Sequence, residues 1–165
     1  MIKFIKTMDV KSPSRGTSVA AGIDFYIPYN TEEFQKAFIE KNSDIEISAS
    51  GIILMPHTRV NIPSGIKVEI PHNYALIAYN KSGVSLKYGL DVGASVVDED
   101  YKGVIHLSLV NTSNECVKLE YGQKIIQFLL IPVAYDEVVE VNSEDELFTR
   151  DSERGSGGFG STGSF

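Results

Sequence analysis

G-L-D-V-G-A-S-V-V-D-E-D-Y-K-G-V-I-H-L-S-L-V-N, at residues 89–111, contains two runs rich in Val, Ile and Leu on either side of the acidic turn D-E-D-Y-K-G. Alternation in the second run, V-I-H-L-S-L-V, puts Ile105, Leu107 and Leu109 on one face. This spacing has the period of a half-buried β-strand. We therefore expect a strand pair closed by the acidic turn.

The turn of this strand pair is expected to hold Asp98, Asp100 and Tyr101 together at one lip. A carboxylate in such a place can be a general base, a metal ligand or an ordinary turn residue, because Asp and Gly also favour turns for conformational reasons. This stretch alone leaves the three alternatives open.

Short apolar segments separated by turn residues cover most of the chain, and regular spacing of this kind is typical of an all-β barrel or sandwich. The expected strands lie at residues 1–10, 20–29, 45–48, 51–55, 58–62, 66–70, 75–79, 115–119, 124–133 and 137–141, besides those of the opening stretch. Only residues 31–41 fit a helix: Thr31 suits the N-cap, and Phe34 and Phe38 share one face. We expect a surface helix inserted between strands.

The composition indicates one globular domain of 165 residues, with 42% hydrophobic and 22% charged residues. A net charge of −7 argues against nucleic acid or a membrane surface as a partner, because both usually require a basic face. Cys116 is the only cysteine, which excludes an internal disulfide, and the three histidines lack the spacing of a zinc site. The first residues lack the apolar core of a signal peptide, so we expect an intracellular, cytoplasmic protein.

Three polar features suit an anionic ligand or a metal. N-K-S-G-V-S at 80–85 follows an apolar strand and fits either a phosphate site or an ordinary solvated turn. G-S-G-G-F-G-S-T at 155–162 lacks the lysine of a nucleotide P-loop, since Ser161 takes its place, but it can close over phosphates with Phe159 on a base; a flexible end is the simpler alternative. Asp24 lies in an apolar strand, where a buried carboxylate needs a partner unless it faces solvent.

Five motifs stand in one order along the chain: A-G-I-D-F-Y at 21–26, K-S-G-V-S at 81–85, D-V-G-A-S-V-V-D-E-D-Y-K-G at 91–103, G-Q-K-I-I-Q at 122–127 and R-G-S-G-G-F-G-S-T-G at 154–163. This series resembles the trimeric deoxyuridine triphosphatase (dUTPase) family. The resemblance implies an all-β, jelly-roll-like subunit that assembles as a homotrimer. It further implies a core of residues 1–150, a short inserted helix near 31–41, and an arm of residues 151–165 that closes an active site in the trimer.

The resemblance also implies an enzyme that hydrolyses dUTP to dUMP and pyrophosphate with Mg²⁺. Such an enzyme limits uracil incorporation into DNA and supplies dUMP for dTMP synthesis. A dUTP-sensing regulatory or partner-binding protein on the same fold, and a relative of dCTP deaminase, remain as alternatives. The sequence does not identify any protein partner besides further copies of the chain.

Carried onto matching positions, the resemblance implies that Asp98 activates the attacking water and that Tyr101 packs on the deoxyribose and excludes a 2′-hydroxyl. Asp24 is implied to hold the metal through water, while the metal is held mainly by the substrate phosphates. The remaining implied substrate-binding residues are Gly93, Ala94, Val96, Val97 and His106 at the uracil edge, and Lys81, Ser82, Gly83, Gln127, Arg154, Phe159, Gly160, Ser161 and Thr162 at the phosphates and base.

The sequence departs from the family pattern in three places. Asn80 and Lys81 stand where the second motif usually reads Pro-Arg, and a lysine lacks the planar fork of arginine. His106 is larger than the residues usual at its position, so only its backbone is expected to contact uracil. The helix near 31–41 lies outside the common core, and we expect a decorative loop; a partner surface is the alternative.

Overall fold

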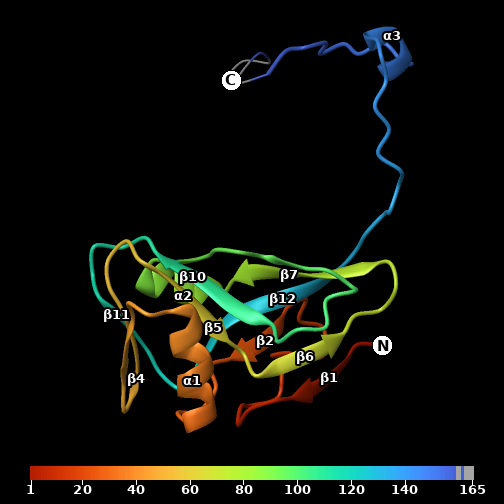
Figure 1. Ribbon diagram of the computed structural model, residues 1–165. Helices are drawn as coiled ribbons and strands as arrows, with labels where there is room; N and C mark the ends of the chain where they lie inside the picture. Colours follow the sequence, from red (N-terminus) through yellow and green to blue (C-terminus); the bar gives the residue numbers. More distant parts are fainter. Residues whose placement is uncertain (159–160, 162–165) are drawn as a thin grey trace. The chain divides into compact units, whose positions relative to one another are not determined.

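The structure, a computed structural model, describes residues 1–158 and 161, and it comprises two units, Met1–Ala134 and Tyr135–Phe165. The first unit contains all the described strands and two helices (Figure 1). The elements are β1 (Lys3–Lys6), β2 (Ile23–Tyr26), α1 (Glu32–Lys41), β3 (Glu46–Ser48), β4 (Gly51–Leu54), β5 (Arg59–Pro63), β6 (Ile66–Glu69), β7 (Tyr74–Asn80), α2 (Ser82–Tyr88), β8 (Leu90–Val92), β9 (Val96–Val97), β10 (His106–Asn111), β11 (Val117–Leu119), β12 (Lys124–Pro132) and α3 (Glu144–Leu147). The division into a core of residues 1–150 and an arm of residues 151–165 stays a prediction for the assembled protein.

Four small sheets form the first unit, with strand orders β2-β12-β7-β9, β5-β10-β8, β11-β4-β3 and β1-β6. Every pairing between these strands is antiparallel, and many neighbours are far apart in the sequence. The expected all-β class is therefore confirmed. No helix in the described part of the chain is long and apolar enough to span a membrane.

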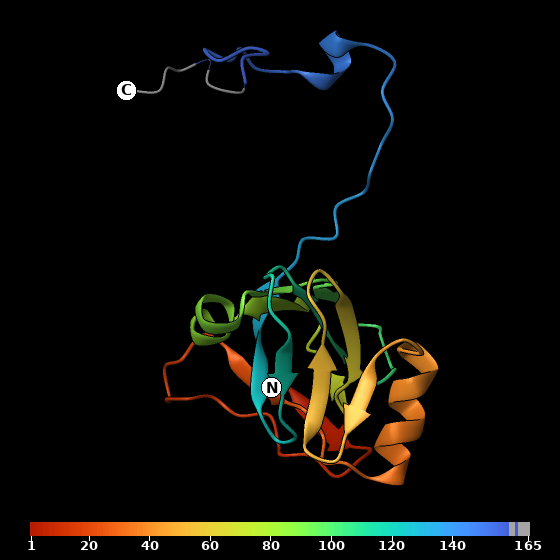
Figure 2. The same ribbon diagram turned by 90° about the vertical axis from the view of Figure 1, so that its left-hand side faces the viewer.

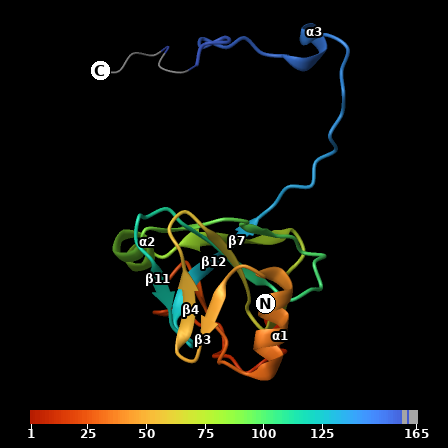
Figure 3. The same cartoon turned by 60° about the vertical axis from the view of Figure 1, so that its left-hand side comes forward.

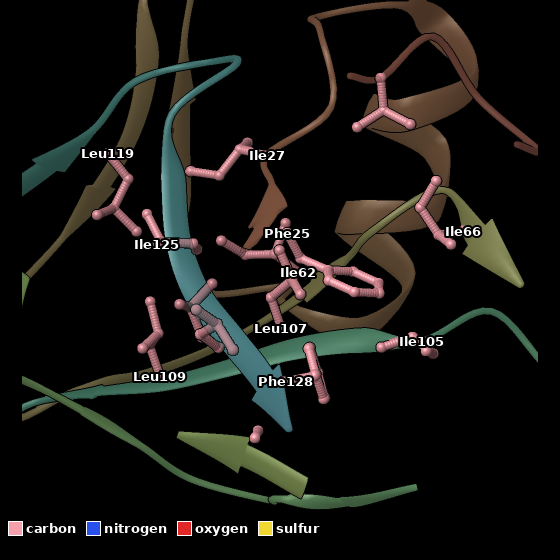
Figure 4. Close-up of a cluster of buried hydrophobic side chains, with 14 of the residues drawn as sticks. Phe25, Ile27, Ile62, Ile66, Ile105, Leu107, Leu109, Leu119, Ile125 and Phe128 are labelled. Atoms are coloured by element: carbon pink, nitrogen blue, oxygen red, sulfur yellow. The ribbon is translucent and has the colours of Figure 1, made fainter. Parts of the chain in front are cut away.

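The core is made by the apolar faces that the alternating strands present. In β10, Leu107 and Leu109 are buried while the residues between them are half-buried, as the alternation predicts. Figure 4 shows their side chains in one cluster with residues of β2, β5 and β12. Phe25 and Phe128 pack there with ring centroids 4.7 Å apart, which joins β2 to β12 beneath the polar residues of these strands.

Helix α1 forms where the sequence predicts it. The Thr31 hydroxyl oxygen accepts a hydrogen bond from the Phe34 amide at 3.2 Å, and Phe34 and Phe38 are fully buried. The Asn42 side chain then joins the helix end to β5, because its amide nitrogen donates to the Phe38 and Asn61 carbonyls at 2.9 Å each. Figures 2 and 3 show α1 beside β3. The expected helix is therefore confirmed, and its buried face contributes two aromatic rings to the core; the expectation that the insert is decorative and no partner surface stays a prediction.

The strand pairing in the opening stretch confirms the expected strand pair in part, because the two runs pair away from the acidic turn but not directly beside it. β10 pairs with β8, through Leu109 opposite Val92, whereas β9 pairs with β7, through Val97 opposite Leu76. The residues directly before the acidic turn therefore belong to a different sheet from those directly after it. A sequence pattern shows which residues form strands, but pairing depends on distant partners that the pattern does not contain.

Other expectations about local structure are also wrong. Residues 137–141 form no strand, and Val138 and Val139 are exposed, because no strand among the described residues pairs with them. The expectation of a single helix missed α2 and α3, which are too short to show helical periodicity.

Candidate active site

A buried carboxylate with two lysine partners lies on the four-stranded sheet. Asp24, in the middle of β2, is only 4% exposed. Its Oδ1 accepts a hydrogen bond from Lys81, which follows β7, and its Oδ2 accepts one from Lys124, the first residue of β12, at 3.0 Å. Burial alone raises the pKa of Asp24, but the hydrogen bonds and charges of the two lysines outweigh burial and lower it overall. The carboxylate is therefore ionised, and the Lys81–Asp24–Lys124 cluster has one net positive charge.

The chain beyond Lys81 presents further donors to solvent. Helix α2 begins at Ser82, and the first N–H groups of a helix have no partner within the helix. Ser82 and Gly83 are exposed, and a side chain added at Gly83 would meet open space. Ammonium, hydroxyl and backbone N–H groups gathered in this way suit a phosphate. We call Lys81, Ser82 and Gly83 the phosphate end of β7.

Gln127 is fixed beside this end by two neighbours. Its side-chain amide donates to the Asn80 carbonyl at 2.9 Å, and a Cβ atom on Gly22 would lie 2.1 Å from its Oε1 atom. Asn80 itself donates from Nδ2 to Asp91 at 2.7 Å and accepts from the Val92 amide at 2.7 Å. Asn80, which stands where the family pattern usually has proline, thus provides a side-chain amide that joins β7 to β8.

The segment of residues 93–97 lies along β7 and β10. The Gly93 amide donates to the Ser108 carbonyl at 3.0 Å, and the Ala78 amide donates to the Ser95 carbonyl at 2.7 Å. A Cβ atom on Gly93 would lie 2.6 Å from the Ser108 hydroxyl, so a larger residue here would require the serine side chain to move. Ala94 and Val96 are exposed and Val97 is half-buried.

Asp98 and Tyr101 begin and end the turn that follows, with the Tyr101 amide 3.2 Å from the Asp98 carbonyl. Both side chains are exposed, so the carboxylate and the ring are accessible to a ligand. The Tyr101 hydroxyl donates to the Val104 carbonyl at 3.0 Å, and a Cβ atom on Gly103 would lie 2.3 Å from that hydroxyl oxygen. The Tyr101 ring therefore packs directly over Gly103, where a side chain would clash with it. His106 is half-buried, and burial lowers its pKa, which favours a neutral imidazole.

Asp98 and the phosphate end lie at opposite ends of β7. Val97 pairs with Leu76, and continuation of the antiparallel strand carries Asp98 toward Tyr74 and away from Lys81. At about 3.3 Å per residue, Asp98 and Lys81 are separated by about 16–20 Å along β7. Figure 1 shows β7 pointing toward α2, which marks the phosphate end. One chain therefore does not bring these two groups to the same phosphate.

Comparisons with known proteins identify the family of this chain. A protein-family model described as dUTPase matches residues 43–163. The deoxyuridine 5′-triphosphate nucleotidohydrolase of Mus musculus is 33% identical over 98% of this chain and 85% of its own length, and that of Mycolicibacterium vanbaalenii is 34% identical over 94% and 89%. The chain belongs to the dUTPase family.

A solved structure shares the fold of this dUTPase-family chain. The dUTPase of Staphylococcus bacteriophage 80alpha, described with dUPNHPP, has a TM-score of 0.75 at 22% identity and covers 99% of this chain and 98% of its own. A second, a dUTPase from phage phi11 of S. aureus described as coordinating a structural Mg(II) ion, has a TM-score of 0.66 at 18% identity, over 87% and 97%. The expected fold of the subunit is thereby confirmed, and its assembly as a homotrimer stays a prediction.

The described residues of the dUTPase-family chain offer one candidate carboxylate, Asp24, for a magnesium ion held mainly by the phosphates of a ligand. In residues 1–158 and at 161, no group of three or more His, Cys, Asp or Glu side chains could hold a metal. Asp24 contributes one hard oxygen donor, and each of its oxygens already accepts from a lysine. Mg²⁺ is commonly bound by one or two carboxylates together with substrate phosphates and water, and this arrangement suits a water-mediated role for Asp24.

The remaining expected residues lie in the second unit. Arg154 is exposed, and its carbonyl accepts from the Gly157 amide at 3.0 Å; Ser161 is also exposed. Phe159, Gly160 and Thr162 lie outside the described residues, so their expected roles stay predictions. Lys124 was missed by the sequence reasoning, although it lies within G-Q-K-I-I-Q and the strand pairing of β12 with β2 brings it to Asp24.

Proposed function

We propose that this protein is a dUTP diphosphatase that hydrolyses dUTP to dUMP and pyrophosphate. The observation that supports this most strongly is the phosphate end of β7, with its net positive cluster, in a chain of the dUTPase family. An acidic protein needs such a local reversal of charge to bind a polyanionic substrate. The homologues from mouse and Mycolicibacterium vanbaalenii are named for this activity.

The proposed active site is shared between chains. Water activated by Asp98 must lie within hydrogen-bond reach of its carboxylate, about 2.6–3.2 Å. The separation of about 16–20 Å along β7 argues against this for a phosphate bound at Lys81 of the same chain. We therefore propose that a second copy supplies Asp98 and Tyr101, and a closed homotrimer with three such sites would meet this requirement. The arm of a third copy, with Arg154, Phe159, Gly160, Ser161 and Thr162, would complete each site.

In the proposed reaction, the Asp98 carboxylate accepts a proton from the attacking water. The oxygen of this water bonds to the α-phosphorus at the same time. The bond from this phosphorus to the bridging oxygen breaks, and pyrophosphate leaves. General-base help of this kind contributes about 10²–10⁴-fold. The Lys81 ammonium, the Ser82 hydroxyl and the Gly83 amide, with Gln127 and Arg154, would orient the triphosphate and offset its charge. Bound Mg²⁺ would supply further charge neutralisation, with Asp24 reaching it through water.

Specificity for deoxyuridine is proposed to come from the segment of residues 93–97 and from Tyr101. Backbone groups of Gly93, Ala94, Val96 and Val97, and the backbone near His106, would bond the uracil edge. Cytosine would leave a buried polar group unpaired, whereas thymine would only add a methyl group. Cytosine nucleotides would therefore be rejected more strongly than thymine nucleotides. The Tyr101 ring, held across Gly103, would pack on the sugar and leave no room for a 2′-hydroxyl.

The activity predicts a cellular role in limiting uracil incorporation into DNA and in supplying dUMP for dTMP synthesis. A dUTP-sensing or partner-binding protein and a dCTP deaminase are the rival functions. The test is release of pyrophosphate and of ammonia from dUTP, dCTP, dTTP and UTP, with and without Mg²⁺. Pyrophosphate from dUTP alone, dependent on Mg²⁺, is expected. Ammonia from dCTP would establish the deaminase, and tight dUTP binding without turnover would establish the sensor.

A further inference from the structure

We propose that Lys124 is a positioning residue that keeps Asp24 paired while Lys81 turns to the substrate phosphates. The inference rests on the proposed function, because it assumes that the phosphate end of β7 binds the triphosphate. Lys124 is assigned no contact with the substrate. Its effect is exerted through Asp24 and Lys81.

The geometry of the cluster makes Lys81 a shared group. The Asp24 side chain is 6% exposed, and Lys81 is its more buried partner, with a side chain 20% exposed. A phosphate that binds to the Lys81 ammonium competes with the carboxylate for the charge and donors of this group, which weakens its bond to Asp24. With Lys81 as its only partner, Asp24 would then be a buried charge without a counter-ion, which is strongly unfavourable.

Lys124 removes this conflict because it bonds the other carboxylate oxygen. Lys81 donates to Oδ1 and Lys124 to Oδ2, so one bond can weaken while the second remains. The backbone of Lys124 is held at the start of β12, opposite Tyr26 of β2, and its half-exposed side chain reaches Asp24 independently of Lys81. Its bond to Asp24 can therefore remain when Lys81 moves. Without Lys124, Lys81 would be held on the carboxylate and lost to the phosphates.

The experiment compares Lys124→Met with Lys124→Arg, and uses Lys118→Met as the matched control, because Lys118 is an exposed lysine on β11. We expect Lys124→Met to raise the KM for dUTP and the Kd of a non-hydrolysable dUTP analogue about tenfold, equivalent to about 1.4 kcal/mol. The kcat should stay within about twofold of wild type, and the inhibition constant of deoxyuridine, which lacks phosphates, should not change. Lys124→Arg should restore the KM, and Lys118→Met should behave as wild type.

A double-mutant cycle with Asp24→Asn separates positioning from direct contact, because it removes the buried charge together with its need for a counter-ion. Once Asp24 is neutral, Lys81 is no longer held by a carboxylate, so adding Lys124→Met should change the analogue Kd by less than about twofold. If the effects of the two single variants on the analogue Kd multiply in the double variant, Lys124 binds phosphate directly and the inference is overturned. An unchanged KM for dUTP in Lys124→Met, or an equal loss of deoxyuridine binding, would also overturn it. If Lys124→Met fails to fold, Lys124→Gln is measured by the same criteria. Failure of wild type to release pyrophosphate would instead refute the proposed function.

Discussion

Two inactive variants of the protein should restore each other's activity when they assemble together. One variant has Asp98→Asn, which removes the proposed base. The other has Lys81→Met and Ser82→Ala, which disrupt the phosphate end of β7. Because these groups lie about 16–20 Å apart along one strand, each proposed site takes its Asp98 from one chain and its Lys81 from another. A mixed assembly therefore contains some sites in which both groups are intact.

The expected recovery follows from counting sites in a closed ring of three chains. In any trimer that contains both variants, one neighbouring pair in the required direction combines an intact Asp98 with an intact phosphate end. The mixed trimers should therefore reach about one third of the wild-type rate. The parents should be about 10²–10⁴-fold slower for the base variant, and about 10²-fold slower for the phosphate-end variant, from about 3 kcal/mol of lost hydrogen bonding.

The assay is co-expression of the two variants with different affinity tags and purification through both tags in succession. Every trimer recovered then contains both chains, and pyrophosphate release from dUTP is measured at saturating substrate. Two differently tagged wild-type chains, purified in the same way, define full activity. Mixed trimers as inactive as their parents would refute the shared site, because a site contained within one chain cannot be restored by a neighbour.

Asp98→Asn alone should lower kcat by about 10²–10⁴-fold and leave binding of a dUTP analogue intact; a wild-type rate would remove Asp98 from the mechanism. Deletion of residues 152–165 should nearly abolish turnover but preserve the assembly seen by size-exclusion chromatography, and a fully active truncation would contradict a role for the arm. Phe34→Ala should lower the free energy of unfolding in urea by about 3–5 kcal/mol, whereas Ile39→Ala, on the exposed side of the same helix, should change it by less than about 0.5 kcal/mol. Equal effects would show that the helix is not anchored through its buried face. The lowered pKa of Asp24 adds stability above the unfolded-state pKa of 3.8, and this stability is lost as the pH falls through the folded-state pKa. Asp24→Asn should therefore cost about 1.5–3 kcal/mol at pH 7, and the difference from wild type should shrink below pH 3.8; a constant difference would exclude this titration.

Local patterns in the sequence predicted the local structure well. The alternation in β10 identified its buried face, and the Thr31 cap with two phenylalanines identified α1. These features depend on residues a few positions apart. The pairing of β9 with β7, and the absence of a strand at residues 137–141, depend on partners elsewhere, and the sequence pattern contains no information about them.

In the candidate site, too, the sequence identified individual residues but not the contacts between distant ones. The motifs identified Asp24 and Lys81, but the contact between them spans 57 positions and that between Asp24 and Lys124 spans 100. From the sequence, Asp24 in an apolar strand either faces solvent or needs a partner, and its burial in the structure requires a partner. Only the register of β2 and β7 against β12 shows which lysines meet this need.

The position of the two functional groups at opposite ends of β7 has a consequence for how the activity responds to dilution. Unit Met1–Ala134 buries its apolar core within a single chain, so separated chains can keep their fold while each holds only part of a site. Under the proposed assembly, dilution separates the chains, so the specific activity decreases as the protein concentration is lowered. The secondary structure does not change. Below a threshold of expression, a cell would then contain folded protein but no dUTP hydrolysis.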